Sequence, residues 1–276
     1  MSVKIVCDSS ANLSALPGIE FEDVPLKILS GDREFVDDHH LDVDMMVDYL
    51  KHVRQRSSTS CPNTDEWLSA FEGADEIYAI TLTSNLSGTW ASCMQAAKVY
   101  QKQHPDARVC VVDSLSAGPE MVLLAEKVRE MKLQGLSFDE VSAQVEAYKQ
   151  RTHLLFALES LKNLANNGRV SPAVAKICEV LSIRLVGTAS LEGTLQPLEK
   201  VRGEKKALAA IVDGMRQRQF AGGKVRIAHC ENEKAAGDLA HLIYCHFPFS
   251  DITICPCGGL CSFYVEKGGL LVAFES

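Results

Sequence analysis

The chain has 276 residues and carries 36 Asp and Glu against 28 Lys and Arg, which gives a formal net charge of −8. Hydrophobic residues make up 46% of the sequence and charged residues 23%, which are ordinary proportions for a globular protein. These values argue against disorder and collagen-like repeats, and the acidic balance argues against nonspecific binding to nucleic acid or to an anionic membrane. The ten cysteines are the one unusual count.

The sequence predicts a cytoplasmic protein with reduced thiols. No stretch reaches the roughly 18 consecutive apolar residues that a membrane helix needs. The N-terminal apolar run, residues 3–7, turns polar at Asp8, too early for the core of a secretory signal peptide. Free thiols are expected in a reducing compartment. Four cysteines lie in apolar surroundings and are expected to be buried as small hydrophobic side chains: Cys7, Cys110, Cys178 and Cys230.

The first half of the chain predicts a parallel sheet with helices on its faces. Strands are expected at residues 3–7, 76–82 and 108–112, and a polar loop follows each one. Amphipathic helices are expected after the last two strands, one running to about residue 102 and one including residues 121–128. This order of strand, polar loop and helix is typical of parallel α/β folds.

The segment between the first two of these strands is less regular. Extended pieces are expected at residues 24–28 and 33–36. Asp44 is expected to cap a helix that runs to about residue 54, because apolar residues then recur at helical spacing. Residues 57–64 read as a polar loop, and a helix that contains Trp67 follows.

The second half mixes hairpins with helices and predicts an α+β domain. Helices are expected at residues 138–151, 172–181, 204–218 and 234–246, with a short one that ends at residues 166–168. Strands are expected at residues 154–158, 183–188, 195–201 and 224–229, and near residues 252 and 270. The predicted architecture is therefore α/β, with an N-terminal three-layer α/β/α domain at residues 1–151 and a C-terminal α+β domain at residues 152–276.

Hydroxyl-rich loops before helices are the strongest local signal for a ligand. Ser87, Gly88 and Thr89 lie where a strand passes into a helix, and free N–H groups and the helix dipole favour an anion there. Thr59 and Ser60, in another loop before a helix, offer two more hydroxyl donors. In an open parallel sheet, ligands bind beyond the carboxyl ends of the strands, where these loops belong. The alternative is that these residues only cap helices and form turns.

A Gly-Arg pair in the second half offers a positive charge. Gly168 follows a short helix and fits the left-handed residue that ends one. Such a turn can direct Arg169 across a cleft between the domains, where a guanidinium pairs with a carboxylate. A solvated surface arginine explains the same residue equally well.

Two clusters suggest metal binding, and their spacing does not favour it. In the first, consecutive side chains point in different directions; it comprises Asp37, Asp38, His39, His40, Asp42 and Asp44. The second lacks the spacing of a zinc ribbon or finger and has no second pair; it comprises Cys255, Cys257 and Cys261. No Walker loop, dinucleotide fingerprint, nucleophile elbow or zinc-protease motif occurs in the sequence.

Taken together, the loops resemble those of the DegV family, a bacterial fatty-acid-binding family. One of them has a cysteine, Cys61, where the family usually has Gln in Thr-Ser-Gln-Pro. The matching stretches, in order, are Asp8-Ser9-Ser10-Ala11-Asn12-Leu13, Val24-Pro25-Leu26, Thr59-Ser60-Cys61-Pro62, Leu86-Ser87-Gly88-Thr89, Val112-Asp113-Ser114, Gly168-Arg169-Val170 and Pro197-Leu198-Glu199-Lys200-Val201-Arg202.

The resemblance implies two domains with one long-chain fatty acid, such as palmitate or oleate, in a buried tunnel between them. It also implies that the protein presents the acyl carboxylate to a separate fatty-acid kinase, which makes an acyl phosphate. No cofactor or metal is expected beside the fatty acid. Carried over by position, the resemblance places Thr59, Ser60, Ser87 and Gly88 at the carboxylate, with Arg169 nearby from the second domain.

The C-terminus departs from the family pattern. The family typically has a His followed by Gly-Pro-Gly before the last strand. When residues 272–274 are aligned with that strand, Tyr264 stands at the His, and Glu266, Lys267 and Gly268 stand at Gly-Pro-Gly. Tyrosine still donates a hydrogen bond, but it does not become a cation near neutral pH. We therefore expect head-group recognition to persist, whereas presentation to a kinase is an open question.

Simple energetics support a lipid ligand independently of the resemblance. Burying about 15 methylenes at ~0.8 kcal/mol each contributes about 12 kcal/mol before the entropic cost of ordering the chain. The carboxylate needs donors or a positive charge, and no nucleophile and base are required. The alternatives are an enzyme that acts on a small carbonyl or acyl substrate, either of phosphotransfer type or a thiol catalyst that uses Cys61 or Cys93, and a lipid carrier without a kinase partner.

Overall fold

The computed structural model describes residues 2–176 and 183–276, so Cys178 and the second half of the helix expected at residues 172–181 lie outside the described residues. A parallel sheet forms the centre of the first half, in the order β2 (Glu20–Val24), β1 (Val3–Asp8), β6 (Glu76–Thr81) and β7 (Arg108–Asp113). A short 3₁₀ helix, η1 (Ser9–Ala11), follows β1.

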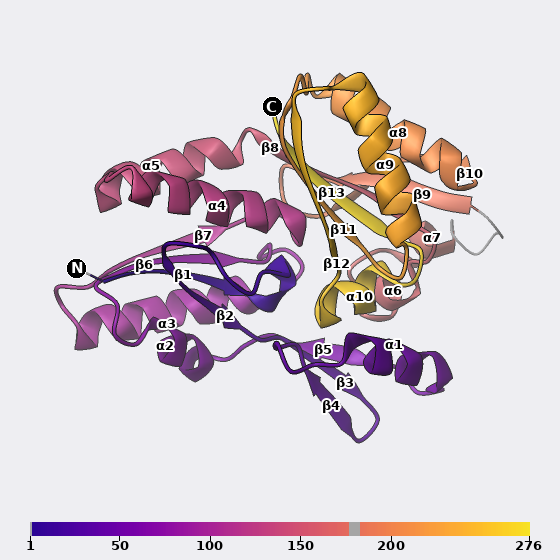
Figure 1. Ribbon diagram of the computed structural model, residues 1–276. Coiled ribbons are helices and arrows are strands. Elements are labelled where there is room, and N and C mark those ends of the chain that lie inside the picture. The colour runs from indigo at the N-terminus through magenta and orange to yellow at the C-terminus, as the bar shows by residue number, and fades with distance from the viewer. Residues whose placement is uncertain (1, 177–182) are drawn as a thin grey trace.

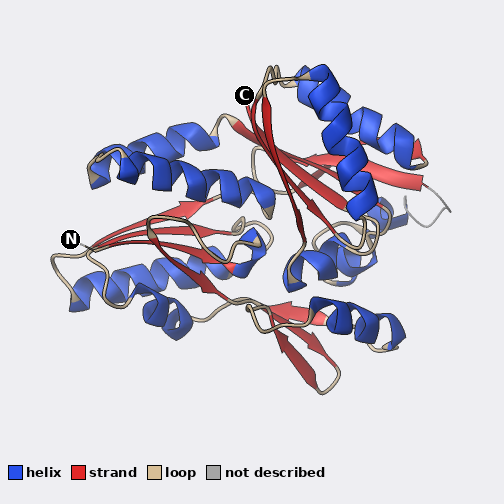
Figure 2. Ribbon diagram, viewed as in Figure 1, coloured by secondary structure: helices blue, strands red, loops and turns tan. Residues whose placement is uncertain are grey.

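Four helices cover this sheet. Helices α2 (Thr64–Phe71) and α3 (Thr89–Gln103) lie on one face, and α4 (Pro119–Leu133) and α5 (Phe138–Lys149) lie on the other (Figures 1 and 2). Capping boxes fix the starts of two of them: Asn63 with Glu66 for α2, and Ser137 with Glu140 for α5. The predicted three-layer α/β/α arrangement is confirmed.

The second half builds a six-stranded mixed sheet. Its order is β10 (Leu195–Arg202), β9 (Ile183–Ala189), β8 (Thr152–Leu158), β13 (Leu270–Glu275), β11 (Gly223–His229) and β12 (Ser250–Pro256). Only β11 and β12 run parallel, and the other pairs are antiparallel. Helices α8 (Glu204–Gln217) and α9 (Glu233–His246) pack on one face (Figure 1). The predicted α+β character is confirmed, and the domain boundary at residue 152 stays a prediction.

A small antiparallel sheet projects from the first half. It consists of β4 (Arg33–Val36), β3 (Lys27–Ser30) and β5 (Ser58–Ser60), and α1 (Val43–His52) packs beside it (Figure 1). Two predictions are wrong here. Asp42, not Asp44, caps α1, because its Oδ1 accepts the Met45 N–H at 2.9 Å. Residues 58–60 are a strand rather than a loop, because they pair with β3.

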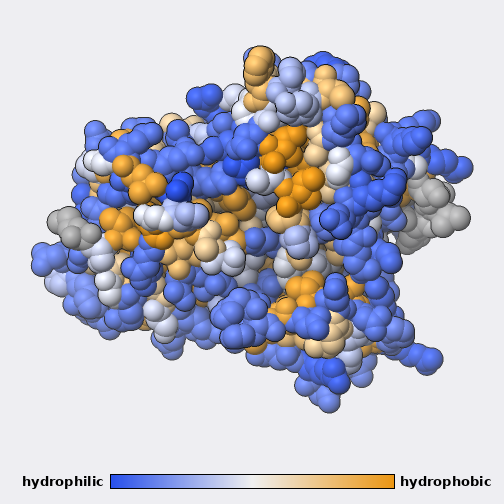
Figure 3. All heavy atoms as spheres, in the orientation of Figure 1, coloured by the Kyte–Doolittle hydropathy of each residue, from blue (hydrophilic) through white to orange (hydrophobic). Residues whose placement is uncertain are grey.

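Three short helices complete the second half: α6 (Lys162–Asn166), α7 (Pro172–Ala175) and α10 (Gly259–Val265). The last of these has no counterpart in the sequence-based prediction. Among the described residues, no helix combines the length and the apolar character that crossing a membrane demands. The face of the molecule seen in Figure 3 is mostly hydrophilic, with apolar residues gathered in several separate places.

Helix α4 joins the two halves. It contacts β1 and β6 on one side and β8, β11 and β13 on the other. Apolar side chains from both sheets and from α4 consequently form one continuous core, which includes Ile5, Ile80, Leu124, Phe156 and Ala273. The loops that follow β1 and β6 contact the second half directly, because the Ser10 carbonyl accepts the Cys261 thiol hydrogen and Asn85 donates to the Glu192 carbonyl. These loops therefore lie between the two halves.

Candidate functional site

A pocket lies between the two halves of the molecule. It holds about 840 Å³ of empty space, its open mouth included. Most of its wall is apolar, and the apolar side chains come from both halves, among them Leu82 and Leu86 from the first half and Leu154, Phe156 and Leu271 from the second. A mostly apolar pocket with a few polar groups is the usual form of a small-molecule site.

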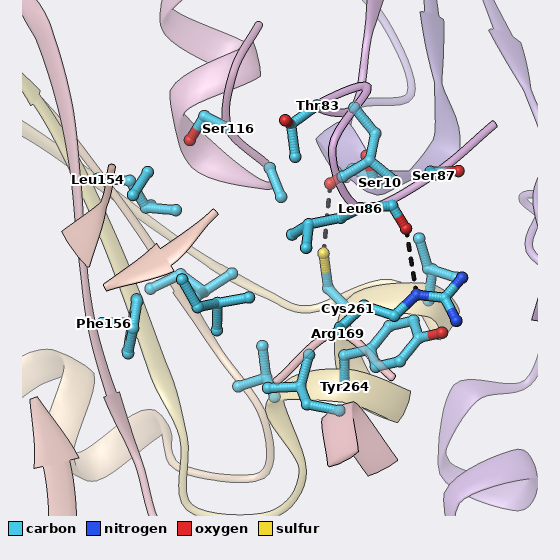
Figure 4. Close-up of a pocket in the computed structure, with 18 of the residues that line it drawn as sticks. Ser10, Thr83, Leu86, Ser87, Ser116, Leu154, Phe156, Arg169, Cys261 and Tyr264 are labelled. Carbon is cyan, nitrogen blue, oxygen red and sulfur yellow. Dashed lines mark hydrogen bonds between the residues drawn. The ribbon is translucent and has the colours of Figure 1, made fainter. Parts of the chain in front are cut away.

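Polar side chains gather at one end of this pocket. The Thr59 and Tyr264 hydroxyl oxygens lie 2.7 Å apart, and the Arg169 guanidinium carbon lies 6.0 Å from the centre of the Tyr264 ring. Figure 4 shows Arg169 and Tyr264 side by side at this end, whereas Leu154 and Phe156 lie toward the other. Burial raises the pKa of Tyr264, so its hydroxyl group stays protonated and able to donate at neutral pH.

Arg169 reaches the first half of the chain from the turn after α6. Gly168 adopts a left-handed conformation, with φ 73°, and the Arg169 N–H then donates to the Leu164 carbonyl at 2.8 Å. The Arg169 side chain donates from Nε to the Leu86 carbonyl at 3.1 Å and from Nη1 to the Asn167 carbonyl. The turn thus directs Arg169 across the interface between the halves. Among the described residues, no carboxylate pairs with its guanidinium group.

The loop before α3 supplies a further hydroxyl group. Ser87 lines the pocket, and its Oγ lies 2.7 Å from the Thr89 Oγ1 and accepts the Thr89 N–H at 3.3 Å. Gly88 is the N-cap of α3 and offers no side chain to the first turn. An anion beside Ser87 would therefore lie at the positive end of the α3 dipole.

Two of the predicted site residues do not line the pocket. Ser60 donates its hydroxyl hydrogen to the Cys61 carbonyl at 3.3 Å, and Gly88 is exposed at the start of α3. Thr59, Ser87, Arg169 and Tyr264 do line it, so the structure brings four of the six together. A positive charge and three hydroxyl groups at the end of an apolar pocket suit a ligand with a carboxylate at one end and a hydrocarbon chain behind it.

Asp8 holds the strand ends in place behind the pocket. Its carboxylate accepts the Leu82 N–H at 2.6 Å, and it accepts both the N–H and the hydroxyl group of Ser10, at 3.1 and 2.5 Å. Burial raises the pKa of Asp8 to about 6, although these hydrogen bonds act in the opposite direction. Since Leu82 and Ser10 both line the pocket, Asp8 positions its wall.

The nine cysteines that the structure describes are all free thiols, as expected. Cys7 and Cys230 are buried as predicted, whereas Cys110 is only partly buried. Cys93 is fully buried outside the pocket wall, and burial raises its pKa well above the usual value, so it stays protonated. Cys61 is partly exposed beside Gly88, where an added Cβ would come within 3.2 Å of its Sγ.

Neither candidate metal cluster is assembled. Within residues 2–176 and 183–276, no group of three or more His, Cys, Asp or Glu side chains is arranged to hold a metal ion. Asp37 instead accepts hydrogen bonds from Ser9 and from the start of α10. Cys261 lines the pocket and donates its thiol hydrogen to the Ser10 carbonyl at 3.3 Å (Figure 4). Burial raises the pKa of Cys257 and Cys261.

Sequence reasoning missed most of the pocket wall. The tip of the β9–β10 hairpin contributes Gly193 and Thr194, and Asn85 holds this tip by donating to the Glu192 carbonyl at 2.6 Å. Gly193 has a φ of 76° and lies so close to Thr83 that a side chain would clash. Gly193 was the one sequence signal for this part of the wall, because a glycine in a hairpin marks both a turn and a place where another segment approaches the backbone closely.

The fold and the site define a two-domain α/β protein that encloses an apolar pocket with a polar end. Residues 2–276 match the family described as "Uncharacterised protein, DegV family". A DegV domain-containing protein of Streptococcus pneumoniae is 43% identical over 279 aligned residues, which cover 100% of this chain and 99% of the relative. The chain belongs to the DegV family.

Solved structures of this family share the whole fold. A DegV family protein from Eubacterium eligens loaded with heptadecanoic acid gives a TM-score of 0.98 at 42% identity and covers 100% of both chains. The Streptococcus pneumoniae Fatty Acid Kinase (Fak) B3 protein, loaded with linoleic acid, gives 0.98 at 43% identity and covers 100% of this chain and 99% of the other. A DegV family protein from Ruminococcus gnavus, refined with vaccenic acid, gives a TM-score of 0.91 at 29% identity and covers 99% of this chain and 100% of the other.

Proposed function

We propose that this protein binds one long-chain fatty acid, with the acyl chain in the pocket between its two halves and the carboxylate at the polar end. The observation that carries the proposal is the pocket itself, whose apolar wall ends at Thr59, Ser87, Arg169 and Tyr264. The similar structures from Eubacterium eligens and Streptococcus pneumoniae, crystallised with fatty acids of this class, support it.

The polar end matches the needs of a buried carboxylate. The two hydroxyl groups of Thr59 and Tyr264, 2.7 Å apart, can each donate to one carboxylate once their mutual hydrogen bond breaks. Arg169 supplies the positive charge, and Ser87 brings the ligand to the start of α3. Ser60 follows Thr59 in β5 and Gly88 follows Ser87 at the start of α3, and in this proposal they shape the mouth rather than touch the ligand.

We assign the phosphorylation of the fatty acid to a separate kinase, so the chain itself acts as a binding protein and not as an enzyme. The name of the similar Fak B3 protein supports a kinase partner. Because such a kinase consumes ATP, the proposal places the protein in the cytoplasm. It needs no cofactor beside the bound lipid. A lipid carrier without a kinase is the second candidate, favoured by the tyrosine at position 264 where the family has a histidine.

Lipid extraction tests the binding function. We expect protein purified under native conditions to release close to one equivalent of C16 or C18 fatty acid on denaturation, measured by mass spectrometry. Delipidated protein should then take up palmitate or oleate. Protein that is empty on purification and takes up neither acid would contradict the proposal.

Substitutions at the polar end test the orientation of the ligand. Ser87→Ala combined with Arg169→Ala should weaken oleate binding by about 2–4 kcal/mol, because a buried carboxylate loses a charge-assisted partner and a donor. Isothermal titration of delipidated protein measures the change. Ser92→Ala with Arg216→Ala is the control, since Arg216 is exposed on α8 and Ser92 bonds only to its own helix. Unchanged affinity in the first variant would place the carboxylate elsewhere.

A further inference from the structure

A basic stretch lies next to the polar end of the pocket. Residues 49–64 contain three Lys or Arg and no Asp or Glu, although the whole chain has a net charge of −8. The three are Lys51, Arg54 and Arg56, and all three are exposed. We call these residues the basic rim. A positive stretch in an acidic protein creates a local field that attracts negative groups to one place on the surface.

The fold fixes the basic rim beside the pocket mouth. Lys51 lies in the last turn of α1, and Arg56 is only three residues before Thr59, a distance of at most about 10 Å along the chain. The Ser57 carbonyl accepts a hydrogen bond from the Asn167 side chain at 3.2 Å, which ties this segment to the turn that carries Arg169. In Figure 1, α1 and β5 lie below α10, the helix that carries Tyr264.

Most of the positive charge on the rim is not neutralised within the protein. Lys51 and Lys267 share one carboxylate, Glu231, at 3.2 and 3.3 Å. Among the described residues, neither Arg54 nor Arg56 forms an ion pair. Exposed cations without partners add nothing to the stability of the fold, so their charge is free to act on another molecule.

We propose that the basic rim is the docking surface for the nucleotide-bearing face of the kinase partner. This inference rests on the proposed function, because phosphoryl transfer to the carboxylate requires the donor phosphate to approach the same mouth in line with a carboxylate oxygen. A kinase that holds ATP brings several negative charges to that point. The positive charge of the basic rim reduces the repulsion between the phosphates of ATP and the acyl carboxylate. It also steers the kinase toward the pocket mouth as the two proteins meet.

Charge reversal tests the docking surface. The protein is loaded with oleate, and the probe is the purified fatty acid kinase subunit of Streptococcus pneumoniae with ATP. Arg54→Glu with Arg56→Glu should raise the KM of the kinase for the loaded protein by about tenfold while kcat changes little, and its KM should respond less to added salt. Lys205→Glu with Lys206→Glu on α8 is the matched control, because it makes the same charge change at exposed, distant positions.

Oleate affinity is measured for each variant in parallel, so failure of binding and failure of docking are separate results. Normal oleate binding with a raised KM in the rim variant alone supports the proposal. An unchanged KM, an equal rise in the control, or no phosphorylation with the wild-type protein overturns it. The proposal is also overturned if the rim variant has an unchanged KM but takes up oleate more slowly from phosphatidylglycerol vesicles. That result would show that the basic rim contacts membranes instead of the kinase.

Discussion

The carboxyl group of Glu120 lies in the first turn of α4, only 5% exposed, and forms a hydrogen bond with Ser116, a residue of the pocket wall. Burial raises its pKa from an ordinary 4.5 to about 7, even though hydrogen bonds with Ser116 and Thr152 act to lower it. A carboxyl group whose pKa is higher in the folded state favours folding when it is protonated. That contribution is complete below about pH 4.5 and is lost as the pH rises through 7.

We therefore expect Glu120→Gln to stabilise the protein in alkaline solution. The variant has no charge to bury, so it should gain up to about 3 kcal/mol at pH 8, a rise of about 5–10 °C in Tm. The gain should fall below about 1 kcal/mol at pH 5, where the wild-type group is protonated in the folded state. Thermal unfolding across this pH range measures it, with the exposed Glu199→Gln as the control. An equal gain at both pH values would contradict this account.

Individual site residues were predictable only where a local motif carries them. Gly168 and Arg169 form a helix end that reads directly from the sequence, and the structure shows Arg169 reaching the Leu86 carbonyl. Tyr264 was predicted only through an alignment with the family. No local pattern marks it, because its hydrogen-bond partner Thr59 lies 205 residues away in the sequence. The apolar residues of the pocket wall could not be predicted for a different reason. A leucine that lines a pocket, such as Leu154, has the same pattern as one that fills a core.

At the scale of elements, the parallel strands β1, β6 and β7 and their helices were predicted closely, whereas the edge strand β2, the strand β5 and the helix α10 were not. Residues 255–265 contain two adjacent glycines and three cysteines, which give no helical signal. The start of α10 is instead held by Asp37, a residue more than 200 positions earlier, which accepts the Gly259 and Leu260 N–H groups at 2.6 and 3.0 Å. Tertiary contacts thus determine this element, and local propensity does not.

This contact predicts the effect of Asp37→Ala. The carboxylate of Asp37 also accepts the Ser9 hydroxyl hydrogen at 2.8 Å, so its removal leaves three donors without their acceptor. We expect a loss of about 3 kcal/mol in the free energy of unfolding, measured with urea. Oleate should also bind more weakly, because Tyr264 lies on α10.

The neighbouring Asp38→Ala is the control for this substitution, since among the described residues the Asp38 carboxylate accepts only from the nearby His40 N–H, at 2.9 Å, in an exposed hydrogen bond. It should change neither stability nor oleate affinity appreciably. If Asp37→Ala were as stable as the wild-type protein, the hydrogen bonds at the start of α10 would not be what holds the helix in place.

At the scale of the whole molecule, the pocket and the core cross the same interface. Helix α4 packs against both sheets, and one continuous core contains Ile80 from the first half and Phe156 from the second. The pocket wall likewise draws Leu82 from the first half and Leu271 from the second. A ligand in this pocket contacts both halves at once, so its binding energy should stabilise their association and not only one of them.

We therefore expect delipidated protein to unfold in a single transition that bound oleate moves as a whole. At a free oleate concentration 100 times the Kd, the folded state gains about 2.7 kcal/mol. For a chain of this size that gain raises the Tm by about 5–10 °C. Differential scanning calorimetry with and without oleate measures the shift in Tm. The same measurement with octane, which lacks a carboxylate, shows how much of the shift comes from contacts at the polar end. Two transitions, of which oleate shifts only one, would show that the halves unfold separately despite their shared core.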